Sequence, residues 1–315
     1  MRRTIAGIGR MLVTVGILIL LFVVYQLWGT GLWTERAQAA MRHDFTAEQQ
    51  QYQREYGTGA KPATSVPRTS ASTAPRTTTT IPQAVRPAPP IPPDGQAEGW
   101  ITIPKIGLHM IFVEGVTRDD LMKGPGHYPG TPMPGTIGNA AIAGHRTTYL
   151  HPFGDVDKLQ PGDDIIIQTV AGSFDYKMYQ QLIVKATDTW VVNNTPDAEI
   201  TLTSCHPKHY AEHRIVIKAR LVPAKSAKPA KPRPPAASSG KSRAQALLAD
   251  GASVQQKSLT PSILWGTIAA LVGLAWWWGF RRWRHPATWV AGVVPFLIVL
   301  FPFYVYLERA LPWGY

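Results

Sequence analysis

The sequence is poor in cysteine, and this shortage limits the kind of domain it can encode. Its 315 residues contain a single cysteine, Cys205, so no disulfide can form within the chain. Extracellular domains that rely on disulfides carry their cysteines in pairs, and a disulfide scaffold is therefore excluded. A lone cysteine is either a buried inert side chain, a site of pairing between chains, or a thiol kept for its reactivity.

Acidic residues are also scarce. The chain has 20 Asp and Glu against 32 Lys and Arg, which gives a formal net charge of +12 and a pI near 9.9. Such an excess of positive charge is typical of proteins that bind nucleic acid. Much of the excess, however, flanks apolar segments or lies in the linker AKSAKPAKPRPPAASSGKSR, where attraction to anionic lipid or wall polymer accounts for it. We therefore expect a membrane as a partner and no nucleic acid.

Three apolar segments contain no charged residue, namely 11–28, 262–280 and 288–307. Each approaches the roughly 20 residues that cross the hydrocarbon core of a bilayer, so each is predicted to be a transmembrane helix. Excess Lys and Arg marks the cytoplasmic side, which places the basic segments 1–10 and 281–287 inside. The prediction is a cell-membrane protein whose central part lies on the extracellular face.

The first apolar segment has a second interpretation. Ala37-Gln38-Ala39 resembles the small-residue site at which a signal peptide is cleaved. That site lies some distance beyond the apolar run, and the run is long for a signal core, so we favour an uncleaved anchor.

Two linkers isolate one domain. The stretch 57–95 is mostly Pro, Thr, Ala, Ser and Arg and cannot bury enough apolar surface to order itself, so we expect a disordered stalk. Before it, 29–56 is a juxtamembrane segment whose polar part, from residue 35, is predicted to be helical. A basic Pro/Ala-rich linker is expected at 223–258. The remaining segment, 96–222, has the size of a single domain.

Helical signals are short within this domain, at 117–123 and 155–160. Its apolar residues lie instead in about eight short runs bounded by Gly, Pro, Asp and Asn, a pattern typical of strands. Many short strands favour a closed barrel or a sandwich, and we expect an all-β domain built as an antiparallel barrel. The expected strands are WITIPKIGL, HMIFVEGV, NAAIAGH, DDIIIQT, FDYKMYQQ, QLIVKATDTWVV, EITLTSC and RIVIKARLV.

Cys205 ends one expected strand and precedes a polar loop, where positioned groups can act on a thiol. Acyl transfer by a thiol needs an acid or base nearby and a cation or amide to hold the oxyanion. His145 ends the strand NAAIAGH and so also stands at a strand tip. Arg214 opens the last strand, and in an antiparallel pair its side chain starts near the cysteine. These three residues are the candidates for catalysis.

The same residues carry a resemblance to a known family. The segment TLTSC at 201–205, with AGHR upstream and Arg214 downstream, resembles the sortases, which are membrane-anchored cysteine transpeptidases with the signature T-L-x-T-C. Ser204 stands where that pattern has Thr, a change that keeps the hydroxyl and loses a methyl group. The Pro-rich stalk, TLTSC and AGHRTTY are most similar to the class E sortases of actinobacteria.

The resemblance implies a closed eight-stranded barrel with short helices, and a reaction. Cys205 would attack the Thr-Gly carbonyl of an LPxTG or LAxTG sorting signal at the C-terminus of a surface protein. Arg214 would stabilise the oxyanion and orient the peptide. His145 would protonate the leaving amine and then take a proton from an amine of a lipid-linked peptidoglycan precursor. Neither a cofactor nor a metal is implied. The residues expected at the substrate groove are Thr203, Ser204 and Tyr149.

Three other interpretations are weighed against this one. A catalytically inactive sortase-like barrel could act as a tethered wall-binding or scaffold protein, and Cys205 would then be dispensable. His209 and His213, with Cys205 or His206, could bind zinc, but they lie between two strands rather than on a helix. An L,D-transpeptidase would carry the motif S-H-G-C, which the sequence lacks. Wall attachment and pilin polymerisation differ only in the acceptor amine and stay open.

Overall fold

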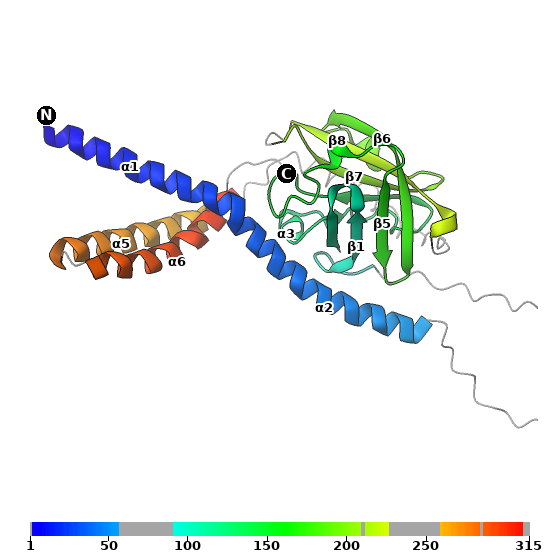
Figure 1. The fold of residues 1–315 in the computed structure, drawn as a ribbon, viewed down its shortest axis with the longest axis horizontal. Coiled ribbons are helices and arrows are strands. Elements are labelled where there is room, and N and C mark those ends of the chain that lie inside the picture. Colours follow the sequence, from blue (N-terminus) through cyan, green and yellow to red (C-terminus); the bar gives the residue numbers. More distant parts are fainter. Residues whose placement is uncertain (1, 57–90, 209–211, 227–258, 284–285, 311–315) are drawn as a thin grey trace, which may run out of the picture.

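The protein folds as a β-barrel with long helices beside it (Figure 1). The computed structural model describes residues 2–56, 91–208, 212–226, 259–283 and 286–310, and the structural statements below concern these residues. Most of the predicted stalk and of the second linker lies outside the described residues.

Eight strands among the described residues form one closed barrel in the order β1-β2-β3-β4-β7-β8-β6-β5. The closed eight-stranded barrel predicted from the sequence is therefore confirmed. Six neighbouring pairs are antiparallel, whereas β2 with β3 and β4 with β7 run parallel, so the expectation of a purely antiparallel barrel is wrong. The strands are β1 (Ala97–Ile103), β2 (Leu108–Glu114), β3 (Gly126–His127), β4 (Gly138–Ala143), β5 (Asp164–Thr169), β6 (Gly172–Lys185), β7 (Ala198–His206) and β8 (His213–Leu221).

Two strands differ from the predicted ones. The runs FDYKMYQQ and QLIVK form a single strand, β6, whose register with β8 shifts between Met178 and Gln180. An inserted residue of this kind breaks the period-2 pattern of apolar side chains, which made one strand look like two. The end of the second run, TWVV, is a 3₁₀ helix, η4 (Thr189–Val192). The strand β3 has two residues and no apolar run, so the sequence pattern missed it.

Alternate residues of β7 face opposite sides of the barrel wall. Ile200 and Leu202 point into the main core, together with Ile215 and Ile217 of β8. The odd-numbered residues of β7, up to Cys205, therefore lie on the outer face. A second buried cluster covers that face, formed by Val116, Leu121, Tyr128, Ala141, Ala143, Val191, Val192 and Val216. Cys205 and its strand partner Arg214 thus lie on the outer wall of the barrel, a face that η4 and residues 116–121 cover in part.

Short helices occur where the sequence predicted them. The helix α3 (Arg118–Leu121) begins with a capping box: the Thr117 hydroxyl accepts from the Asp120 amide, and the Asp120 carboxylate accepts from the Thr117 amide. The 3₁₀ helix η3 (Val156–Lys158) occupies the second predicted position. Two further 3₁₀ turns, η2 and η5, span Pro104–Ile106 and Pro223–Lys225.

The N-terminal helix runs on from the apolar segment to the side of the barrel (Figure 1). α1 (Arg2–Val24) passes through a π-helical turn, η1 (Tyr25–Gly29), into α2 (Thr30–Tyr56). The buried side chains Thr34, Gln38, Met41 and Phe45 of α2 recur every three or four residues, so they share one helix face. The apolar members of that face pack on β1, β2 and the β5–β6 turn, against Ala97, Trp100, Ile111, Val113 and Val170.

Gln38 ties α2 to the edge of β2. Its Nε2 donates to the carbonyl oxygens of Ile111 and Lys123, at 2.8 Å and 2.9 Å, and its Oε1 accepts from the Ile111 amide at 2.9 Å. Within the described residues β3 pairs with β2 only at Val113 and Glu114. The Gln38 amide therefore continues the hydrogen bonding of β2 beyond the end of β3, and the barrel is mounted directly on the N-terminal helix.

The C-terminal helices α5 (Thr260–Trp283) and α6 (Pro286–Ala310) pack together and lie beside α1 (Figure 1). The Tyr304 hydroxyl donates to the Leu18 carbonyl at 2.7 Å. The end of α5 and the start of α6 lie at the same end of this group as the start of α1.

The helices α1, α5 and α6 differ in the length of their apolar stretches. Among the described residues, the helical stretch Thr260–Gly279 has the length and apolar composition needed to cross a membrane, and Leu12–Val24 and Ala291–Leu307 are shorter apolar helical stretches.

Candidate active site

The parallel pair of β4 and β7 brings His145 and Cys205 to the same end of the barrel wall. The two strands are still paired at Thr203, whose carbonyl accepts from the Gly144 amide at 3.1 Å. His145 follows Gly144, and Cys205 follows two residues after Thr203. The Ser204 hydroxyl donates to the Gly144 carbonyl at 2.8 Å, which ties the two strand ends together.

The strand β8 supplies a cation beside the thiol. Arg214 is the direct partner of Cys205 in the antiparallel pair of β7 and β8. Its Nη1 lies 3.9 Å from the cysteine Sγ and also donates to the His213 carbonyl at 3.3 Å. Cys205, His145 and Arg214 are only 6%, 7% and 5% exposed. The three candidates from the sequence are thus buried near the ends of the adjacent strands β4, β7 and β8, with Arg214 beside Cys205.

The loop after His145 has an unusual backbone. Tyr149, Leu150 and His151 have φ angles of 51°, 60° and 38°, a region that residues other than glycine seldom adopt. A hydrogen bond from the Phe153 amide to the His145 carbonyl, at 3.1 Å, closes the loop. The ring of Tyr149 packs on that of His145, with centroids 4.9 Å apart. Strain of this kind concentrates at functional sites, and here it holds an aromatic ring against the imidazole.

Comparisons with known proteins identify the family. The sortase-domain family model matches residues 101–222. Sortase D of Bacillus subtilis strain 168 is 35% identical over 135 residues, which cover 42% of this chain and 67% of that protein. The chain belongs to the sortase family.

Other relatives address the class of this sortase. SrtE1 of Streptomyces coelicolor is 28% identical over 232 residues, which cover 69% of this chain but 56% of that protein. SrtE2 of the same organism is 26% identical over 241 residues, or 70% of this chain and 83% of that protein. These relatives confirm the class E resemblance. A crystal structure of sortase E1 from Streptomyces coelicolor, with a tripeptide in its active site, is 31% identical and covers 44% of this chain and 92% of that one, with a TM-score of 0.40.

Burial shifts the pKa of both the thiol and the imidazole of this sortase toward the neutral form. Burial raises the pKa of the Cys205 thiol, although the cations of Arg214 and Arg146 act in the opposite direction. Burial, and then the charge of Arg118, lower the pKa of His145 to about 4. Both shifts favour the neutral thiol and the neutral imidazole near neutral pH.

The three residues predicted at the substrate groove lie on different faces. Thr203 shares the outer face of β7 with Cys205, and its hydroxyl lies 3.1 Å from the hydroxyl of Tyr128. Tyr149 packs against the imidazole, as described above. Ser204 points to the opposite face of β7. All three are buried, and their contact with substrate stays a prediction.

Arg146 was given no role in the sequence analysis. Its Nε donates to the Gly154 carbonyl at 2.9 Å, and its Nη2 forms an ion pair with Asp157 at 2.8 Å. Its Nη1 is buried and has no hydrogen-bond partner among the described residues. Since its charge also acts on Cys205, it is a second guanidinium at the site. The only signal in the sequence was its position directly after His145 in AGHR.

Proposed function

We propose that this protein is a membrane-anchored sortase that cleaves a C-terminal sorting signal of LPxTG or LAxTG type between Thr and Gly, and joins the Thr to an amine of a lipid-linked peptidoglycan precursor. Members of this family are cysteine transpeptidases, and the chain belongs to it. The observation that carries the proposal is the convergence of the single cysteine with His145 and Arg214 at three adjacent strand ends.

In the first half of the reaction, the Cys205 thiol transfers its proton to the imidazole of His145. The sulfur attacks the Thr carbonyl carbon, and the charge that develops on the carbonyl oxygen is stabilised by Arg214. The His145 imidazolium then protonates the glycine nitrogen as the carbon–nitrogen bond breaks. The products are a thioester on Cys205 and a free peptide amine.

In the second half, the acceptor amine attacks the thioester. His145 takes a proton from the attacking nitrogen, the carbon–sulfur bond breaks, and the departing sulfur receives that proton. One amide bond has replaced another, and the thiol and imidazole return to their neutral forms. A neutral imidazole at rest suits this cycle because His145 must accept a proton at the start of each half.

A lipid-linked acceptor is supported by the position of the catalytic loop. The helix α2 begins directly after the apolar stretch Leu12–Val24 and η1. A Cβ placed on Gly31, in the first turn of α2, would lie 3.2 Å from Cδ2 of Leu150, and Leu150 belongs to the loop that holds Tyr149. The catalytic loop thus lies against the turn of α2 nearest the proposed membrane surface, where a lipid-linked amine would be held.

The proposed topology has three membrane helices, at 11–28, 262–280 and 288–307, with 1–10 and 281–287 in the cytoplasm. The grouping of α1, α5 and α6 supports it, because the start of α1, the end of α5 and the start of α6 lie at one end (Figure 1). The test starts from the cysteine-free Cys205→Ala chain and adds Trp190→Cys or Arg282→Cys. In intact cells a membrane-impermeant maleimide should label only the first variant, and the reverse pattern would refute the topology.

The activity test uses the full chain in a detergent micelle or nanodisc, because α2 is part of the folded domain. The protein is incubated with LPxTG and LAxTG peptides and an amine acceptor, and the products are identified by mass spectrometry. We expect a Thr-linked product and a thioacyl adduct on Cys205, both lost in Cys205→Ala. If folded wild-type protein gives neither, the chain is better explained as an inactive sortase-like barrel that acts as a tethered wall-binding or scaffold protein.

A further inference from the structure

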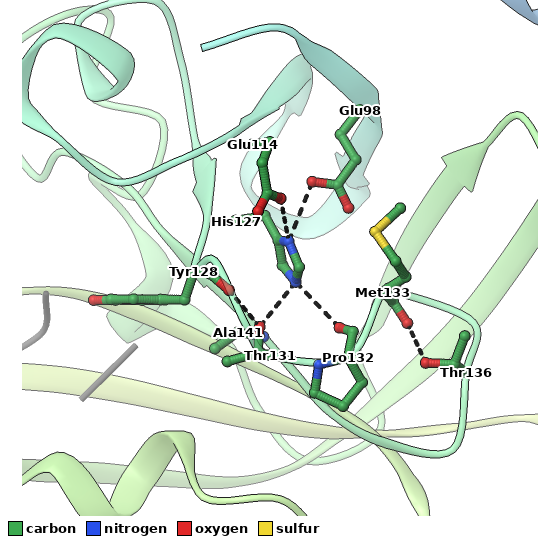
Figure 2. Close-up of polar contacts among 9 residues, drawn as sticks. All are labelled: Glu98, Glu114, His127, Tyr128, Thr131, Pro132, Met133, Thr136 and Ala141. Atoms are coloured by element: carbon green, nitrogen blue, oxygen red, sulfur yellow. Dashed lines mark hydrogen bonds and ion pairs between the residues drawn. The ribbon is translucent and has the colours of Figure 1, made fainter. Parts of the chain in front are cut away.

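Three buried ionisable side chains, none of them a candidate catalytic residue, meet at neighbouring strands of the barrel (Figure 2). They are Glu98 of β1, Glu114 of β2 and His127 of β3, here called the carboxylate–histidine cluster. Nδ1 of His127 lies 2.7 Å from Oε2 of Glu114 and 3.2 Å from Oε2 of Glu98. The side chains of His127, Glu98 and Glu114 are 1%, 0% and 5% exposed, so water does not screen their charges.

The other ring nitrogen of His127 fixes the orientation of the imidazole. Its Nε2 lies 3.1 Å from the Pro132 carbonyl and 2.8 Å from the Thr131 hydroxyl (Figure 2). A carbonyl oxygen can only accept, so Nε2 carries a hydrogen and donates it. Metal-binding histidines typically donate their second ring N–H to such an acceptor, which directs the remaining nitrogen toward the ion. In this cluster the remaining nitrogen, Nδ1, is directed at the two carboxylates.

The cluster places two carboxylates around a single imidazole. One oxygen from each carboxylate and Nδ1 all lie within 4.8 Å of one another, so three potential ligand atoms lie close enough to share one ion once the proton between them is lost. Oε1 of Glu98 is buried and has no hydrogen-bond partner among the described residues, and Oε2 has only the ion pair with His127. A proton on Nδ1 would place one positive charge against two negative ones in a buried site, and an uncompensated buried charge is strongly unfavourable. A divalent cation would balance both carboxylates while the imidazole stays neutral.

Protons can partly fill this role when no ion is bound. Burial raises the pKa of Glu98 to about 7. Burial by itself lowers the pKa of His127, but the two carboxylates raise it well above its usual value. An incoming cation would therefore displace protons from the cluster, as metal ions generally do at carboxylate and imidazole ligands.

We propose that Glu98, Glu114 and His127 bind one small divalent transition-metal ion, with Zn²⁺ as the representative. One imidazole nitrogen and two carboxylate oxygens form a ligand set that suits zinc, with a further position open. Ca²⁺ is disfavoured because it requires six to eight oxygen ligands. Neither the resemblance nor the proposed transpeptidation calls for this site, and it differs from the expectation that the chain has no metal.

The ion would have a structural role, linking three strands. The strand β3 consists of two residues and pairs with its neighbours only at Gly126 and His127, which makes it the shortest strand of the barrel. Three ligands from β1, β2 and β3 would hold it in place. Because Nε2 of His127 contacts Thr131 and Pro132, the ion would also help to position the turn at 128–132. The Tyr128 hydroxyl of this turn lies 3.1 Å from the hydroxyl of Thr203, near Cys205. The ion does not touch the reacting atoms.

The first test measures bound metal. The full chain is prepared without a histidine tag in the Cys205→Ala background, which removes the thiol as a competing ligand, and is equilibrated with Zn²⁺ and then freed of excess. We expect about one equivalent of zinc per chain by mass spectrometry of the metal, lost in the isosteric variants Glu98→Gln and Glu114→Gln. The matched control is Glu199→Gln, which alters a buried carboxylate that pairs with Arg220 outside the cluster.

The second test measures thermal unfolding of the same chains with Zn²⁺, with Ca²⁺ and with a chelator. An ion at about a hundredfold excess over its Kd should raise the unfolding temperature by roughly 5 °C or more. Zn²⁺ should do so in the background and in Glu199→Gln, and in neither cluster variant. Folded protein that binds no zinc, or binds zinc that Glu98→Gln and Glu114→Gln leave in place, would overturn the proposal. So would an equal effect of Ca²⁺.

Discussion

Replacing Gln38 by alanine should weaken the docking of α2 on the barrel without altering a candidate catalytic residue. Its side chain makes three hydrogen bonds, to the amide and carbonyl of Ile111 and to the carbonyl of Lys123. Gln38 is 2% exposed, so solvent does not replace these bonds while the helix is docked. At about 1 kcal/mol for each bond, docking should weaken by about 3 kcal/mol. This corresponds to an undocked population roughly a hundredfold larger.

Amide hydrogen exchange measures this population. The full chain in nanodiscs is compared with Gln38→Ala, and exchange is followed in peptides that cover residues 39–46 of α2. This part of the helix is polar on its outer side, and an undocked helix in water opens more readily than one supported by tertiary packing. We therefore expect its amides to exchange about a hundredfold faster in the variant.

The control and the activity assay separate docking from folding. Gln53→Ala changes an exposed glutamine on the same helix and should leave exchange unchanged. Cleavage of a soluble sorting peptide by Gln38→Ala should continue. Transfer to an acceptor embedded in the membrane should fall, because the distance between the barrel and the membrane surface is less strictly fixed. If exchange in α2 does not increase, the three hydrogen bonds do not hold the helix and the barrel is not mounted on it as described.

Three further predictions concern the thiol and its neighbours. Arg146→Gln removes a cation that lowers the pKa of Cys205, so the midpoint of thiol alkylation by iodoacetamide should move to higher pH, and an unchanged midpoint would contradict the assignment. Ser204→Ala loses the bond to the Gly144 carbonyl and should lower the free energy of unfolding in denaturant by about 1 kcal/mol, while Ser204→Thr should retain it. The pKa of His145 is about 4 when folded against 6.5 when unfolded, so the unfolded chain takes up the proton first. The contribution of His145 to stability should be complete above pH 6.5 and decline as the pH falls toward 4; an NMR titration that places its pKa near 6.5 would refute this.

The predicted strands show how much of the fold can be inferred from local sequence. Runs of apolar residues between turn signals located six of the eight strands, because burial of one strand face is written in the strand's own residues. The pattern failed at β6, where a bulge resets the alternation, and at β3, whose two residues contain no apolar run. The parallel pairing of β4 with β7 could not be inferred either, since it depends on where β5 and β6, which separate the two strands along the chain, lie in the barrel.

The sequence by itself determined the chemical character of this protein. Cys205, His145 and Arg214 could be singled out as candidates because each stands at the end of a strand that its immediate neighbours define, and the apolar segments because their length and lack of charge are local properties. The tertiary structure decided which polar groups meet. Gln38 docks on β2, and Glu98 approaches His127, because a buried polar side chain must find a partner wherever the fold provides one. No periodicity encodes such a partner, so contacts between distant segments became visible only in the folded chain.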